Sequence, residues 1–174
     1  MIVTEKTGKL SNGQVWTYQF GGRVDLLAKD DPANCVMVTH LNTTNDEPFE
    51  DDVWDKSFDP MFGGNKKLRA EYDSVCWDCY IADREGLETT YNYIRKASME
   101  AIKGIKKNRP HNTTISEGQF NDIYADVIDM IETEEGWNRY GDEQWLIGTD
   151  GIISSMVDEQ LEDYLNACGF VVEF

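Results

Sequence analysis

Apolar residues recur at two different spacings along this chain, and the change from one to the other limits its fold more than any other feature. Near the N-terminus they gather in short runs rich in β-branched and aromatic residues, at 14–20 (QVWTYQF), 23–28 (RVDLLA) and 35–41 (CVMVTHL). Such runs predict β-strands. Beyond Arg84 the apolar residues recur every three or four positions, which predicts helices. Strands followed by helices indicate an α+β fold.

Turn-forming residues separate the predicted strands. Gly21 and Gly22 stand between the first two strands and predict a hairpin, and residues 30–34 (DDPAN) predict a longer connection. Residues 42–70 are polar and predict a long loop, a feature that is often functional in a compact domain. The run 74–81 (SVCWDCYI) is apolar and aromatic, and we expect a further strand there.

Three helices are expected in the rest of the chain. The first runs from Arg84 to about Lys107, and the second begins at Ser116 with the pattern of a capping box. The last begins near Ser154 or Ser155 and ends at Cys168, where Gly169 provides a helix stop. A short strand is expected at 144–147 and a closing strand at 170–174. The expected fold is therefore an antiparallel sheet, mainly from the N-terminal half and the C-terminal strand, packed against about three helices.

Acidic residues outnumber basic ones by 33 to 16 in the 174 residues, for a formal net charge of −17. Residues 1–112 hold 18 acids and 15 bases, whereas residues 113–174 hold 15 acids and one base, Arg139. We therefore expect a single domain, 1–174, with a charge-balanced, sheet-rich part (1–112) and a strongly acidic, helical part (113–174). A second acidic focus lies in the predicted loop, at Asp46, Glu47, Glu50, Asp51, Asp52, Asp55 and Asp59.

The remaining composition favours a soluble, folded protein of the cytoplasm. Aromatic residues make up 11% of the chain, which is too many for a disordered acidic chain. No apolar run approaches the roughly 20 residues of a membrane span, and the first residues lack the apolar region of a signal peptide.

The acids of the second and third predicted helices fall on their outward faces. Several stand four positions apart, where like charges destabilise a helix by a few tenths of a kcal/mol per pair. A chain that repeatedly accepts this cost gains something from the charge elsewhere. We predict a partner-binding surface made of Asp122, Asp126, Asp129, Glu132, Asp158, Glu159, Glu162 and Asp163. The alternative is a solvated surface that only keeps the protein soluble.

The sequence contains no pattern typical of catalysis. His40 and His111 are the only histidines, and neither G-x-S-x-G nor H-E-x-x-H occurs. Gly63 and Gly64 precede lysines but do not complete a phosphate-binding loop. We expect no catalytic residue, no bound metal and no cofactor.

Cys76 and Cys79 form a C-x-x-C motif, which has three interpretations. A redox motif would lie at a helix N-terminus, where the thiol pKa falls, whereas this one lies in a predicted strand. A zinc site would need two further ligands, which Cys35 and His40 could supply from a neighbouring strand. We favour the third interpretation, cysteines that act as small buried hydrophobic residues.

The charge density of the second helix suggests a function. Residues 117–135 hold seven acids over about 28 Å of helix, and duplex DNA carries one charge per roughly 1.7 Å. Two such helices side by side would approach that density. We predict an acidic inhibitor that mimics DNA and occupies the nucleic-acid groove of a basic protein. In composition and size the chain resembles small acidic phage and mobile-element proteins of the anti-restriction and anti-CRISPR type.

The expected partner is a basic nucleic-acid-binding protein or nuclease, and neither nucleic acid itself nor a membrane. Two alternatives are open. An immunity protein or antitoxin that covers a basic toxin nuclease would use charge complementarity in the same way. A small metal-dependent enzyme or zinc protein would use a carboxylate pair, such as Glu85 and Glu88, or the cysteine and histidine residues named above.

Overall fold

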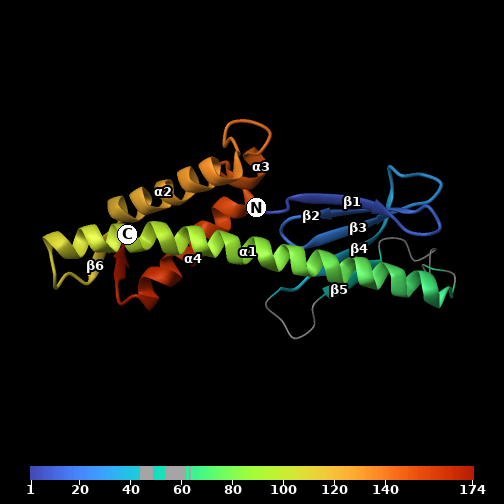
Figure 1. The fold of residues 1–174 in the computed structure, drawn as a ribbon, viewed down its shortest axis with the longest axis horizontal. Coiled ribbons are helices and arrows are strands. Elements are labelled where there is room, and N and C mark those ends of the chain that lie inside the picture. The colour runs from blue at the N-terminus through green and yellow to red at the C-terminus, as the bar shows by residue number, and fades with distance from the viewer. Residues whose placement is uncertain (44–48, 54–61, 63) are drawn as a thin grey trace. The chain divides into compact units, whose positions relative to one another are not determined.

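The computed structural model describes residues 1–43, 49–53, 62 and 64–174, and for 49–53 it describes the backbone alone. The chain divides into two compact units, one of residues 2–86 and one of residues 87–174 with Met1. The boundary falls inside the longest helix, α1 (Lys66–Asn108), and not after Asn112, where the charge balance changes. Figure 1 shows the elements of both units. The α+β class predicted from the sequence is confirmed.

The first unit is built on a five-stranded antiparallel sheet in which each strand pairs with the next along the chain. In the strands Val15–Gln19 and Arg23–Leu27 every second residue is buried, as Trp16, Tyr18, Val24 and Leu26 show, because side chains alternate between the two faces of a sheet. The five strands are β1 (Glu5–Lys9), β2 (Val15–Gln19), β3 (Arg23–Leu27), β4 (Cys35–Leu41) and β5 (Phe49–Val53).

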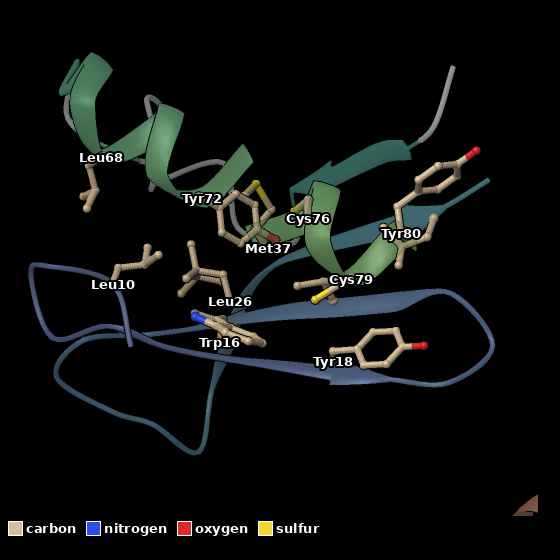
Figure 2. Packing of buried hydrophobic residues seen from close by; sticks show 13 residues of the cluster. Leu10, Trp16, Tyr18, Leu26, Met37, Leu68, Tyr72, Cys76, Cys79 and Tyr80 are labelled. Atoms are coloured by element: carbon tan, nitrogen blue, oxygen red, sulfur yellow. The ribbon is translucent and has the colours of Figure 1, made fainter. Parts of the chain in front are cut away.

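The first part of α1 covers this sheet. Leu68, Tyr72, Cys76 and Cys79 are buried in one cluster with sheet residues that include Trp16, and Figure 2 shows them turned toward the strands. Their spacing of four, four and three residues places them on one face of a helix. The strand predicted at 74–81 is therefore wrong. The helical period is visible only when the run is read together with Leu68 and Tyr72.

A buried carboxylate ties α1 to the hairpin between β2 and β3. Asp83 is 2% exposed and accepts hydrogen bonds of 2.9 Å from the Tyr18 hydroxyl and from the Gly21 amide. Gly21 and Gly22 both have positive φ, 100° and 92°, which confirms the predicted glycine turn and explains its composition. Burial raises the pKa of Asp83, although the hydrogen bonds from Tyr18, Gly21 and Gly22 act in the opposite direction.

The second unit contains the end of α1 and the acidic helices. Two short strands pair in parallel, with Ile115 opposite Val172. The predicted C-terminal strand is thus present, but it pairs with β6 and does not return to the five-stranded sheet. The elements are β6 (Thr114–Ser116), α2 (Glu117–Glu135), α3 (Gln144–Ile147), α4 (Ile152–Ala167) and β7 (Val171–Glu173).

Two further expectations need correction. Residues 144–147 form a helical turn and not a strand: adjacent Leu146 and Ile147 are both buried, which a half-buried strand does not allow. The predicted loop at 42–70 contains strand β5 and the start of α1. Its remaining part lies largely outside the described residues, with four acids of the second focus, Asp46, Glu47, Asp55 and Asp59.

Candidate functional site

Caps fix the start and the end of α2, and a stripe of apolar residues determines which face it exposes. The Ser116 hydroxyl accepts a hydrogen bond from the Gln119 amide, and the Gln119 side chain accepts one from the Ser116 amide. This is the predicted capping box. At the other end Gly136 adopts a left-handed conformation, with φ of 70°. Phe120, Ile123, Val127, Ile128 and Ile131 form the buried stripe.

The α2 stripe leaves carboxylates on the opposite side. Asp122, Asp126 and Asp129 are exposed, and Glu132 is half-buried. The same arrangement recurs in α4, where Ile153, Val157, Leu161 and Leu165 are buried. Its outward residues are the exposed Asp158, Glu159, Glu162 and Asp163. We call these two sets the acidic face of α2 and the acidic face of α4.

The two acidic helices are neighbours in the same unit and are braced by α1. α2 and α4 contact each other, and the Tyr124 hydroxyl donates a 3.3 Å hydrogen bond to the Ser154 carbonyl. From α1, Tyr93 donates a 2.7 Å hydrogen bond to Glu135 at the end of α2. α1 and α4 are joined by an aromatic contact between Tyr91 and Tyr164, whose ring centroids lie 5.9 Å apart.

One cation compensates part of the α2 face. Arg139 forms ion pairs with Asp129 and with Glu132, the latter at 2.5 Å, and its backbone amide donates to Glu132 at 3.1 Å. The side-chain hydrogen bond lowers the pKa of Glu132 and raises that of Arg139. Two predicted contact residues therefore hold a loop in place. Within the described residues, none of the other six predicted partner-binding residues forms an ion pair.

Arg139 belongs to the connection between α2 and α3, residues 136–143, which we call the α2–α3 loop. Hydrogen bonds run through it: the Asn138 amide donates to Glu143, and the Tyr140 amide donates to the Asn138 side chain. The Gly141 amide donates to the Asn138 carbonyl. Within this hydrogen-bonded loop, Tyr140 is 87% exposed. No pattern in the sequence indicates Tyr140, although its neighbour Arg139 is the only base in residues 113–174.

A small cavity of about 270 Å³ lies beside this loop. Its lining residues come from α2 (Tyr124 and Ile128), from the α2–α3 loop (Arg139 and Tyr140) and from α3 and the residues that follow it (Gln144, Ile147, Gly148 and Thr149). A larger groove of about 860 Å³ lies at the other end of the unit and is lined by residues of α1, β6 and α2, with Glu173 and Arg109 among them.

In the described part of the chain, the cysteines and His40 considered above for redox or zinc chemistry do not come together as a redox or metal site. Cys76 and Cys79 lie inside α1, about three turns from its start at Lys66, and are buried, so they are not at a helix N-terminus. Burial, with the neighbouring Cys76, raises the pKa of Cys79 to about 12, so its thiol is protonated and unreactive at neutral pH. Among the described residues, Cys35 and His40 included, no group of three or more metal-ligating side chains is assembled.

Trp137 also belongs to the α2–α3 loop and is half-buried.

Comparison with protein-family models, with curated proteins and with solved structures finds no match for this chain. No helix in the described part of the chain combines the length and the apolar character needed to cross a bilayer.

Proposed function

We propose that this chain is an acidic protein-binding inhibitor that mimics nucleic-acid charge and blocks a basic nucleic-acid-binding protein or nuclease in the cytoplasm. One observation carries the proposal. Six carboxylates on the faces of α2 and α4 are exposed, and within the described residues no cation pairs with them. Exposed charge without a partner in the same chain is available to a partner of opposite charge, and it accelerates encounter with that partner.

The charge density of α2 on its own falls short of that of nucleic acid. α2 holds seven acids in its sequence. Arg139 compensates two of them, and a third, Glu135, accepts a hydrogen bond from Tyr93. The remaining four stand about 7 Å apart on average along a helix of about 28 Å. One helix is thus sparser than the phosphates of duplex DNA. α4, which contacts α2, contributes the rest of the charge in this proposal.

Competition with DNA tests the proposal. The immobilised protein is incubated with host lysate at low and at high salt, and bound proteins are then eluted with duplex DNA. We expect salt-sensitive capture of a nucleic-acid-binding protein and its release by DNA, because both ligands would occupy the same groove. Release by salt alone, with DNA without effect, would contradict mimicry and would favour a partner bound outside its nucleic-acid groove.

A further inference from the structure

The turn between β1 and β2, residues 10–14, contains the only asparagine in the chain that is followed by a glycine, Asn12 before Gly13. In such a pair the backbone nitrogen of the glycine can attack the Cγ carbon of the asparagine, because glycine has no side chain to obstruct the approach. Gly13 is exposed, and no atom lies within 4 Å of the position that a Cβ would take there. Water therefore reaches the peptide bond that this reaction uses.

The reaction converts Asn12 into an acid. The Gly13 nitrogen loses its proton and forms a bond to Asn12 Cγ, while the bond between Cγ and Nδ2 breaks and Nδ2 leaves with that proton as ammonia. Water then opens the cyclic imide at either of its carbonyl carbons. The product is an aspartate, or an isoaspartate in which the main chain runs through the side-chain carbons. Each product carries one negative charge that asparagine lacks.

The folded turn holds both reacting groups. The Gly13 N–H donates a 2.9 Å hydrogen bond to the Leu10 carbonyl, which retains the proton that has to be lost. Asn12 Oδ1 accepts a 2.9 Å hydrogen bond from the Gln14 amide, and Asn12 Nδ2 donates a 2.8 Å one to the Gln14 side chain. Contacts of this kind with the backbone two residues on are typical of asparagine in turns. Because ring closure expels Nδ2, it has to break the bond to Gln14, and the turn must open first.

A contact with α1 keeps the same turn closed. Glu71 accepts two hydrogen bonds from Ser11, one of 2.6 Å from the backbone amide and one of 2.7 Å from the hydroxyl. Hydrogen bonds to a carboxylate are stronger than those between neutral groups. Since Ser11 immediately precedes Asn12, Glu71 restrains the reacting residue from a distant part of the sequence.

We propose that Asn12 is a deamidation site controlled by the fold, and that it reacts only when the β1–β2 turn opens and releases Asn12 from Gln14 and Ser11 from Glu71. The inference goes beyond the proposed function and is independent of it, because the turn belongs to residues 2–86 and the acidic faces to residues 87–174. The product places a carboxylate next to Ser11, and its repulsion of Glu71 weakens the contact that held the turn.

Mass spectrometry of the tryptic peptide 10–23 measures the reaction in protein stored at mildly alkaline pH. We expect deamidation of Asn12 to be at least about tenfold slower in the folded protein than in the same protein in urea, because the folded chain reacts only through local opening. Folded Glu71→Ala should react about fivefold faster than folded wild type, the factor expected when about one net hydrogen bond is lost.

Three further variants isolate the contact. Glu71→Gln removes the charge but keeps an acceptor for Ser11, so its rate should stay closer to that of wild type than the rate of Glu71→Ala. Asp78→Ala removes an exposed acid from the same helix and should leave the rate unchanged. Gln14→Met removes the acceptor of Asn12 Nδ2 at similar volume and should accelerate the reaction.

The outcomes decide the inference. Equal rates in folded and urea-unfolded wild type would show that the turn gives no protection and would contradict it, and so would the absence of reaction in urea. If Glu71→Ala fails to fold and reacts as fast as protein in urea, Gln14→Met provides the decisive comparison. A folded Gln14→Met variant that reacts at the wild-type rate would then overturn the control of Asn12 by the turn.

Discussion

Arg139 holds Glu132 by two contacts, a 2.5 Å ion pair from its guanidinium and a 3.1 Å hydrogen bond from its own backbone amide. The same guanidinium also pairs with Asp129. The single base of the acidic region thus acts as a clamp between the end of α2 and the loop that presents Tyr140. The candidate interface contains an ordered element as well as a charged one.

Removal of this clamp should loosen the loop without unfolding the unit. We expect Arg139→Gln to lower the free energy of unfolding by only about 1 kcal/mol, because a partly exposed ion pair is screened by solvent. The amides of residues 137–141 should exchange faster in hydrogen-exchange measurements, whereas those of α4 should not change. Unaltered exchange at the loop would contradict the role of Arg139.

The Glu132 contact should also give a specific dependence on pH. Its pKa in the folded protein lies below the ordinary value of 4.5, so the stabilisation is present above that value and is lost as the pH falls through the lowered one. We expect the difference in stability between wild type and Glu132→Gln to shrink below about pH 4.5. Urea unfolding across the acidic range measures this. A difference independent of pH would contradict it.

Asp83 should show the opposite dependence. Its folded pKa is raised above 3.8, mainly by burial, so its contribution is fully present below that value and is lost as the pH rises through the raised one. We expect Asp83→Asn to gain stability relative to wild type as the pH rises above about 4. Asp83→Leu, which leaves the Tyr18 hydroxyl and the Gly21 amide without their acceptor, should cost about 1–3 kcal/mol. A relative loss for Asp83→Asn as the pH rises would contradict the direction of the shift.

Gly22 should resist substitution more strongly than another glycine of similar conformation. Its φ is +92°, and an added Cβ would lie 2.8 Å from the Leu41 carbonyl oxygen. Gly13 has φ of +86° with no atom within 4 Å of such a Cβ. We expect Gly13→Ala to cost about 1–2 kcal/mol for conformation alone, and Gly22→Ala about 1–3 kcal/mol more for the steric conflict. Equal losses in urea unfolding would contradict this explanation.

The sequence predicted those elements whose signals are local. The capping box at Ser116, the glycines of the first hairpin and the buried stripe of α2 depend on neighbouring residues, and the structure confirms them. Strand β1 was not predicted, since its residues EKTGK have no β-type pattern. Its pairing with β2, Gly8 opposite Trp16 for example, depends on the partner strand.

In the candidate site, too, the features with local signals could be predicted from the sequence, and the contacts between more distant residues could not. Exposure of the acidic residues followed from helical periodicity, and the structure confirms it for seven of the eight, with Glu132 half-buried. The pairing of Arg139 with Asp129 and Glu132 spans seven to ten positions across a helix cap, and no periodic pattern contains it. The exposure of Tyr140 depends on the conformation of that loop. It could not be predicted from the sequence for the same reason.

The most direct test of the central claim compares two variants of equal charge. One removes four acids from the proposed faces, with Asp122→Asn, Asp126→Asn, Asp158→Asn and Glu162→Gln. The other removes four exposed acids elsewhere, with Glu5→Gln, Asp30→Asn, Asp78→Asn and Glu88→Gln. We expect the first to lose at least tenfold in affinity for the captured DNA-binding protein (about 1.4 kcal/mol), while the second stays within a factor of two or so. Equal losses would show that net charge alone drives binding and would contradict an interface on α2 and α4.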